Sequence, residues 1–293
     1  MQVAVIGVGV MGSAIASRLL ECGIAVHVHD RNAQQVAPLV ARKACAADSA
    51  RDAASRADII ITSLNTAAIV EQVVFGPDGI AQAADRDKLL IDMSSIDPGR
   101  TATMAQRLGN LTGMGWVDAP LSGGAGAALA GKLTLMVGGE PAHVARARVV
   151  LDHLARNITH FGGPGTGQTV KLINQILCAN TFLAVAEAVR FAEAHDVDAS
   201  LIPAALAAGR ADSRIMQEYM AKMARRDYSP TGRIDNMLKD LETVQASALA
   251  ARIPLPVTSL IADLHRMAVA GGLGAADSAA YMRLYDLDSE PPA

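Results

Sequence analysis

The glycine-rich segment Gly7-Val8-Gly9-Val10-Met11-Gly12 restricts the fold of this chain more than any other feature of its sequence. It follows the apolar run 3–6 directly and precedes a segment of helix-favouring composition at 14–21. A strand, a glycine turn and a helix in this order are typical of the first unit of an α/β domain that binds dinucleotides. The alternative is a glycine-rich turn without a ligand, but the elements on either side favour the dinucleotide.

The glycines and the start of the helix each have a physical role in this interpretation. Gly7 permits the tight turn, Gly9 lets a pyrophosphate lie against the backbone, and Gly12 lets the helix pack on the strand. Val10 and Met11 lie between these glycines, and the N-terminus of the helix that follows supplies amide donors and positive potential. We therefore assign these five residues to cofactor binding.

An acidic residue, Asp30, follows the motif by about 20 residues, at the end of the second expected strand. Its carboxylate can accept hydrogen bonds from the ribose hydroxyls and would repel a 2′-phosphate, so NAD is favoured over NADP. Arg31 keeps NADP possible, because its guanidinium could pair with that phosphate or stack on the adenine. Helix capping is the alternative for Asp30 and Asn32, since both are good N-cap residues.

Up to about Gly162, short β-branched runs alternate with longer alanine-rich segments, which is the pattern of β-α units in a parallel sheet. Strands are expected at residues 3–6, 25–29, 59–63, 89–92, 116–118, 133–137 and 158–161. Helices are expected at 14–21, after Asn32, and at 51–57, 100–108 and 141–155, with Pro98 and Pro141 suited to helix starts. We predict the α/β class, with an N-terminal Rossmann-type doubly wound sheet over residues 1–162.

The pattern changes after Phe161, because residues 162–167 are rich in turn formers and no convincing strand follows. We expect an all-α C-terminal domain over residues 163–293, beginning with a long interdomain helix at about 168–195. Further helices are expected at 200–208, 213–225, 233–251, 256–270 and 277–285. The methionines at 216, 220 and 223 follow helical spacing and are interpreted as core.

Composition excludes several classes of function. With a net charge of −3 and 3% aromatic residues over 293 positions, the chain lacks the basic surface and stacking platforms that nucleic-acid binding needs. Cys22, Cys45 and Cys178 are odd in number and far apart, which indicates reduced thiols, a cytoplasmic chain and no metal site. The longest apolar stretch, 172–186, is too short and too polar to suggest a membrane span. No signal peptide is visible, since the run 3–6 lacks a charged flank.

Three further segments combine with the glycine loop. They are Asp118-Ala119-Pro120-Leu121-Ser122-Gly123-Gly124, Gly165-Thr166-Gly167-Gln168-Thr169-Val170-Lys171-Leu172-Ile173-Asn174-Gln175, and Lys239-Asp240-Leu241. With these four motifs in order over nearly the whole chain, the sequence resembles the β-hydroxyacid dehydrogenase family, which includes 3-hydroxyisobutyrate dehydrogenases and tartronate semialdehyde reductases. The resemblance implies hydride transfer between NAD(P) and a small β-hydroxy carboxylic acid, at a site between the two domains of a homodimer or homotetramer.

Two loops receive roles from this resemblance. Ser122, Gly123 and Gly124 can present a hydroxyl and unshielded amides to an anion, and a plain turn is the alternative. The resemblance implies that they bind the substrate carboxylate. It also places Ser95 beside the cofactor, although a serine that caps the helix before Pro98 would look the same.

Lys171 lies on an otherwise apolar helix face, where a surface lysine with a buried stem is the ordinary interpretation. The resemblance makes it the catalytic lysine that carries the substrate proton, which requires its pKa to fall from about 10.4. Asn174 would then help to hold the substrate, and Gln175 stands where relatives commonly carry a second asparagine. By the same resemblance Lys239 lies beside the nicotinamide. A solvated helix charge that pairs with Asp235 is its alternative.

Departures from the family pattern leave the substrate open. Pro230-Thr231-Gly232 replaces the usual Pro-Gly-Phe, Ala246 replaces a downstream acidic residue, and Leu64-Asn65 stands where Leu-Pro is usual next to the cofactor. A larger pocket is one result of these changes. Hydroxyisobutyrate, glycerate or tartronate semialdehyde, threonate and a longer hydroxy diacid all remain candidates.

Two other functions compete with a hydroxyacid dehydrogenase. Imine reductases share the two-domain assembly, but they usually replace the residue that corresponds to Lys171. A non-catalytic nucleotide-sensing protein would keep the glycine loop and would have no reason to keep Ser122, Lys171 and Lys239 together.

Overall fold

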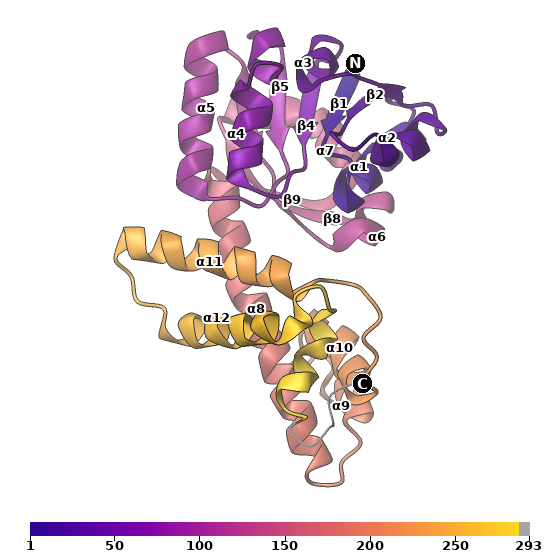
Figure 1. Ribbon diagram of the computed structural model, residues 1–293, viewed down its shortest axis with the longest axis vertical. Coiled ribbons are helices and arrows are strands. Elements are labelled where there is room, and N and C mark those ends of the chain that lie inside the picture. Colours follow the sequence, from indigo (N-terminus) through magenta and orange to yellow (C-terminus); the bar gives the residue numbers. More distant parts are fainter. Residues whose placement is uncertain (287–293) are drawn as a thin grey trace. The chain divides into compact units, whose positions relative to one another are not determined.

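The computed structural model describes residues 1–286, and the chain divides into two compact units (Figure 1). The first unit, Met1–Lys171, is an α/β domain, and the second, from Leu172 onward, is helical. The long helix α8 begins in the first unit and continues into the second. The predicted fold class, a Rossmann-type sheet followed by a helical domain, is confirmed.

One sheet organises the first unit. Its strands follow the order β3-β2-β1-β4-β5-β6-β8-β7, and β9 pairs with β8. The strands are β1 (Gln2–Ile6), β2 (Ala25–His29), β3 (Cys45–Ala46), β4 (Ile59–Thr62), β5 (Leu89–Asp92), β6 (Gly115–Asp118), β7 (Leu121–Ser122), β8 (Leu133–Gly139) and β9 (Ala155–Gly162). The strands from β3 to β6 in this order are all parallel, whereas β8 runs antiparallel to β6 and β7. Every predicted strand is present, and the two-residue strands β3 and β7 were not predicted.

Helices cover both faces of this sheet (Figure 1). They are α1 (Val10–Glu21), α2 (Ala33–Val40), α3 (Ala50–Ser55), α4 (Ala67–Phe75), the 3₁₀ turn η1 (Ile80–Ala83), α5 (Pro98–Thr112), α6 (Gly124–Leu129) and α7 (Pro141–Leu154). Pro98 and Pro141 begin their helices as predicted. The sequence interpretation missed α4 and α6.

The hydrophobic core of the first unit has two layers, one on each face of the sheet. Alternate residues of a strand point to opposite faces, so Val3 and Val5 pack with α1 and α7 while Ala4 and Ile6 pack on the other side of the sheet. All four side chains are fully or almost fully buried. A sheet buried on both faces explains why its strands appear as continuous apolar runs.

The second unit contains the remaining helices, except for the first turns of α8, which belong to the first unit. They are α8 (Thr166–Glu193), η2 (Ala199–Leu201), α9 (Ile202–Leu206), α10 (Arg214–Ala224), α11 (Ile234–Ala251), α12 (Pro256–Ala268), η3 (Val269–Leu273) and η4 (Ser278–Leu284). Met216, Met220 and Met223 lie in its core, as predicted. Three predicted helices differ. The helix predicted at 200–208 is the 3₁₀ turn η2 followed by the short helix α9. Helix α12 ends at Ala268 before a π-helical turn, in which Gly272 has a φ of +85°, and the helix predicted at 277–285 is a 3₁₀ helix.

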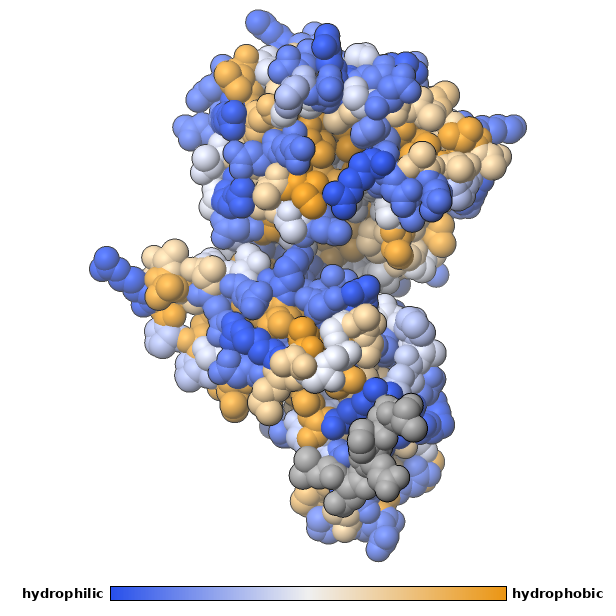
Figure 2. Space-filling model, viewed as in Figure 1, coloured by the Kyte–Doolittle hydropathy of each residue, from blue (hydrophilic) through white to orange (hydrophobic). Residues whose placement is uncertain are grey.

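Helix α8 is the one helix of residues 1–286 that is long and apolar enough to cross a membrane. Its 28 residues exceed the stretch 172–186, so the expectation that this region is too short to span was wrong about its length. In the structure 44% of the most apolar part of α8 is buried. A core helix of a folded domain can be as long and as apolar as α8. Hydrophilic residues cover much of the face shown in Figure 2, with apolar residues in smaller patches. A single helix of this kind is weak support for a membrane span.

Candidate active site

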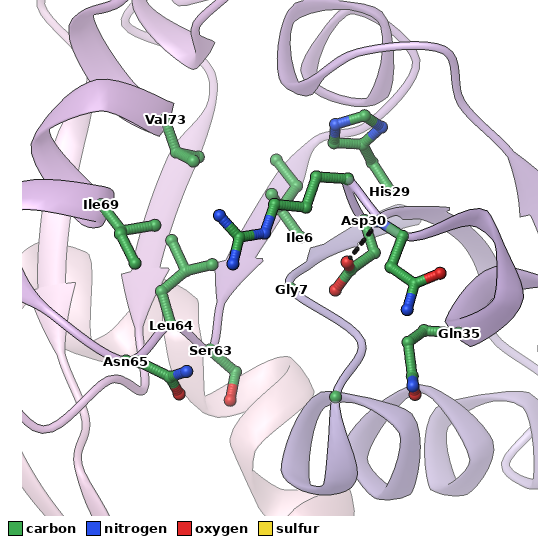
Figure 3. Close-up of a pocket in the computed structure, with 13 residues that line it drawn as sticks. Ile6, Gly7, His29, Asp30, Gln35, Ser63, Leu64, Asn65, Ile69 and Val73 are labelled. Atoms are coloured by element: carbon green, nitrogen blue, oxygen red, sulfur yellow. Dashed lines mark hydrogen bonds between the residues drawn. The ribbon is translucent and has the colours of Figure 1, made fainter.

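A pocket of about 440 Å³ opens in the first unit, around the carboxyl ends of β1, β2 and β4 (Figure 3). Ligands of open α/β sheets bind at such strand ends, where the strand order reverses, and here β1 lies between β2 and β4. The lining residues are Ile6, Gly7, Gly9, His29, Asp30, Arg31, Asn32, Gln35, Ser63, Leu64, Asn65, Ile69 and Val73. The pocket thus brings together Gly7, Gly9, Asp30, Arg31, Leu64 and Asn65 of the predicted cofactor residues.

The glycine loop has the geometry that its sequence predicts. Gly7 adopts a φ of +86°, and a Cβ there would lie 2.5 Å from the carbonyl oxygen of Ser63. A Cβ on Gly12 would lie 1.8 Å from the carbonyl oxygen of Gly7, so only glycine permits this contact of helix and loop. A Cβ on Gly9, in contrast, would meet no atom within 4 Å. The space beside Gly9 is therefore open to a ligand.

Helix α1 begins at Val10, and its N-cap residue Gly9 has no side chain to accept from the first-turn amides. Amides without a capping side chain, at the positive end of a helix, are suited to bind phosphate. Met11 lies in this same first turn and packs partly against the core. The loop and the helix start therefore fit the pyrophosphate of a dinucleotide.

Asp30 is held at the pocket by two backbone amides. Its Oδ2 accepts from the amide of Val8 at 2.9 Å, and its Oδ1 accepts from the amide of Asn32 at 2.9 Å. Asn32, not Asp30, caps α2, because its side chain accepts from the amide of Gln34 at 3.0 Å. The capping alternative is thus confirmed for Asn32 and wrong for Asp30.

Much of the pocket wall was not predicted from sequence. His29, Asn32 and Gln35 come from β2 and the start of α2, and Ile69 and Val73 come from the missed helix α4. A capping threonine could have shown where α4 begins. The Thr66 side chain accepts from the amide of Ile69 at 3.2 Å.

The predicted carboxylate-binding loop joins the end of β7 at Ser122 to the start of α6 at Gly124. Gly123 and Gly124 have φ values of +125° and +70°, which favour glycine at both positions. The ammonium group of Lys171 donates to the carbonyl oxygen of Leu121 at 3.0 Å, directly before Ser122 in the chain. Lys171 is half-buried, and the structure brings it beside this loop.

Four predicted cofactor residues of the first unit are not part of the pocket lining, namely Val10, Met11, Gly12 and Ser95. Ser95 follows β5, and the capping alternative for it is wrong because Asp97 is the N-cap of α5 and accepts from the amide of Arg100 at 2.7 Å. Gly12 is buried beneath the glycine loop.

The predicted residues of the second unit are joined through a residue that was not predicted, Asp240. Asn174 Nδ2 donates to Gln175 Oε1 at 2.8 Å, and Gln175 Nε2 donates to Asp240 Oδ2 at 2.6 Å. The other oxygen, Asp240 Oδ1, pairs with Lys239 Nζ at 3.0 Å. The pairing of Lys239 with Asp235 was wrong, because Asp235 pairs with Arg233.

The segment Pro230-Thr231-Gly232, which departs from the family pattern, is held by hydrogen bonds to Asp277. Its Oδ2 accepts from the amide and the hydroxyl of Thr231, both at 2.6 Å, and from the amide of Gly232 at 3.0 Å. A Cβ on Gly232 would meet only the Ser278 hydroxyl, at 3.9 Å. There is space for a side chain at position 232.

Asp92 and Asp118 are buried carboxylates at the ends of the adjacent strands β5 and β6, where they lie opposite each other in register. Burial raises the pKa of Asp92 to about 6, and the charge of Asp118 adds to the rise. Burial also raises the pKa of Asp118, although the amides of Gly165 and Gln168 oppose that rise. In residues 1–286 no group of three histidine, cysteine or acidic side chains could hold a metal ion.

Comparison with known proteins identifies the two units. Residues 2–163 match the family model of the NAD-binding domain of 6-phosphogluconate dehydrogenase, and residues 165–285 match the NAD-binding domain of NADP-dependent 3-hydroxyisobutyrate dehydrogenase. The 2-hydroxy-3-oxopropionate reductase of Escherichia coli (strain K12) is 35% identical over 291 residues, which are 98% of each chain.

Solved structures agree with this result. The 3-hydroxyisobutyrate dehydrogenase of Salmonella typhimurium superposes with a TM-score of 0.86 at 32% identity, covering 97% of this chain and 99% of that one. An imine reductase of Streptomyces aurantiacus has a TM-score of 0.66 at 21% identity and covers 98% of this chain and all of its own. At that identity the likeness shows a shared fold only.

Proposed function

Since the chain belongs to the β-hydroxyacid dehydrogenase family, we propose that it transfers a hydride between a nicotinamide dinucleotide and a small β-hydroxy carboxylic acid. It is an NAD(P)-dependent oxidoreductase of that family. The observation that carries the proposal is the Lys171 ammonium group at the carbonyl oxygen of Leu121, beside the Ser122 loop and in the same unit as the glycine pocket.

The pocket supports NAD as the preferred cofactor. The backbone amides of Val8 and Asn32 hold the Asp30 carboxylate at the pocket, where it can accept from ribose hydroxyls and repel a 2′-phosphate. Arg31 also lines the pocket and is the available partner for a phosphate. NADP is therefore the competing cofactor.

The side chains near Lys171 would divide the chemistry between them. A bound nicotinamide would supply the hydride acceptor for oxidation and the hydride donor for reduction. In oxidation Lys171 would act as the neutral amine and take the proton of the substrate hydroxyl, which makes it an ammonium group; in reduction that ammonium group would give its proton to the carbonyl oxygen. Ser122 and the amides of Gly123 and Gly124 hold the substrate carboxylate, since they offer donors without a shielding side chain.

The remaining site residues complete the proposal. Asn174 would hold the substrate, and Gln175 would keep Asn174 in place through the hydrogen bond between their side chains. Lys239 and Ser95 would lie beside the cofactor, as their positions in the family motifs suggest. We also propose a homodimer or homotetramer in the cytoplasm, from the family resemblance and the three dispersed cysteines.

A substrate panel tests this function. Hydroxyisobutyrate, glycerate, threonate, serine and a longer hydroxy diacid would be assayed with NAD and with NADP, using wild-type protein and Lys171→Ala. We expect turnover of at least one acid by the wild type, and its loss in the variant. Tight dinucleotide binding without turnover of any acid would instead support the nucleotide-sensing protein, and turnover of cyclic imines alone would support an imine reductase.

A further inference from the structure

The first turn of α8 is fastened to the sheet by a fully buried side chain, Gln168. Gln168 Oε1 accepts from the amide of Ile96 at 3.1 Å, and Gln168 Nε2 donates to the carbonyl oxygen of Ser94 at 2.8 Å. Both partners belong to the segment that follows β5. The amide group therefore uses its donor and its acceptor on one short stretch of backbone, which fixes the rotation of α8 about its axis.

A second set of hydrogen bonds holds the backbone at the start of α8. The carboxylate of Asp118, at the end of β6, accepts from the amide of Gly165 at 2.8 Å and from the amide of Gln168 at 3.0 Å. The carboxylate lies between two glycines, because a Cβ on Gly138 would come within 2.6 Å of its Oδ1 and a Cβ on Gly167 within 2.8 Å of its Oδ2. The start of α8 thus has little freedom to shift along the strand ends.

Lys171 lies three residues after Gln168, which is one turn further along the same helix. Its ammonium group reaches the carbonyl oxygen of Leu121 at 3.0 Å. A rotation or shift of the first turn would therefore move the ammonium group relative to the Ser122 loop.

A hydrogen bond also connects the segment after β5 to the wall of the cofactor pocket. The Ser94 hydroxyl accepts from the amide of Leu64 at 3.0 Å, and Leu64 lines that pocket. Ser94 thus bonds to the pocket wall through its side chain and to Gln168 through its carbonyl oxygen. Ser94 therefore connects the cofactor pocket, by hydrogen bonds, to the helix that carries Lys171.

We propose that Gln168 is a positioning residue for the proton transfer by Lys171, a role that rests on the proposed function of that lysine. Gln168 touches neither the pocket nor the Ser122 loop through any hydrogen bond described for it, so it acts through the placement of α8. Misplacing a reacting group by about 1 Å can cost about 100-fold in rate. We expect a loss of kcat of about 10- to 100-fold when both side-chain bonds are removed, with dinucleotide affinity almost unchanged.

A double-mutant cycle tests the proposal. Gln168→Leu removes both side-chain bonds at similar volume, and Gln168→Met removes the same bonds with an unbranched side chain as a milder second variant. Thr169→Val is the matched control, because the Thr169 hydroxyl bonds only within the same turn, to the carbonyl oxygen of Gly165. Each variant is also combined with Lys171→Ala, and kcat is expressed per dinucleotide-binding site, so that unfolded protein does not count.

If Gln168 acts through Lys171, Gln168→Leu lowers kcat about 10-fold or more in the wild-type background and less than about twofold in the Lys171→Ala background. Gln168→Met is expected to lower kcat as Gln168→Leu does, and Thr169→Val to stay close to wild type. Equal losses in the two backgrounds would show a merely structural residue and overturn the proposal. So would a wild-type-like kcat in Gln168→Leu. A Lys171→Ala enzyme that keeps full activity would instead refute the proposed function.

Discussion

The buried carboxyl group of Asp92 makes the stability of the sheet domain depend on pH in an unusual direction. Burial raises its pKa from 3.8 to about 6, even though Thr62 and Ser94 donate to it, and one of its oxygens has no hydrogen-bond partner among the described residues. Between pH 4 and 6 the folded state therefore binds more protons at this site than the unfolded chain does. The contribution of Asp92 to the free energy of unfolding must fall as the pH rises through this window.

The size of the effect follows from the shift. A change of one pKa unit corresponds to about 1.4 kcal/mol, so the rise from 3.8 to about 6 predicts a loss of about 3 kcal/mol between acid and neutral pH. Asp92→Asn cannot titrate. We expect the variant to gain stability relative to wild type by up to about 3 kcal/mol between pH 4 and pH 7, whatever constant offset the substitution introduces.

Urea unfolding at a series of pH values measures this difference. The single tryptophan of the chain, Trp116, is buried on β6 beside the strand that ends in Asp92, so its fluorescence reports the unfolding of this sheet. Asp78→Asn, at an exposed position, is the control for removing one carboxylate. A difference between Asp92→Asn and wild type that stays flat from pH 4 to pH 7, or that changes in the opposite direction, would show that the Asp92 carboxyl group is not held neutral by burial.

Three further substitutions test the proposed site. Lys171→Ala should lower kcat by about 10²- to 10⁴-fold and leave dinucleotide affinity nearly unchanged. A loss below about tenfold would show that Lys171 does not carry the proton. Recovery of activity with a small exogenous amine would support its role in the proton transfer. Asp30→Ser should raise the ratio of kcat/KM with NADP to that with NAD by about tenfold or more, with Arg31 as the phosphate partner, whereas a wild-type enzyme that already prefers NADP would show that Arg31 dominates. Gly232→Phe should lower kcat/KM for the native acid by about tenfold and spare a three-carbon acid such as glycerate, since space is open at this position. Wild-type kcat/KM that peaks at the smallest acids would contradict an enlarged pocket.

The strands and the glycine loop could be predicted because their causes are local. Strands that are covered on both faces are mostly apolar, and β1, β4 and β5 have only one polar residue each, at a strand end. The contact between Gly7 and Gly12 lies within one turn, so the spacing of the glycines predicts it. The strands β3 and β7 have two residues each, too few for any pattern, and they exist because neighbouring strands pair with them.

The polar contacts that hold the site together could not be predicted in the same way. Gln168 bonds to residues more than 70 positions earlier in the chain, and Gln175 bonds to Asp240 over 65 positions. No local periodicity contains such pairs, since they depend on which strand ends and helices the fold places together. Even Lys171 was singled out by family resemblance, because a lysine on an apolar helix face is usually explained by its stem alone.

The two buried carboxylates at the ends of β5 and β6 give these contacts a common origin. Asp92 accepts from the hydroxyl of Thr62 and the amide of Ser94, and Ser94 in turn holds the amide of Leu64 in the pocket wall. Asp118 accepts from the first turn of α8, which carries Lys171. A charge without enough partners costs stability when it is buried, so the domain tolerates these groups only while their donors stay in place. The donors to Asp92 are next to the pocket wall, since Thr62 precedes Ser63 and Ser94 bonds to Leu64, and the donors to Asp118 lie at the start of α8. A change at either carboxylate should therefore disturb the candidate site as well as the stability of the sheet.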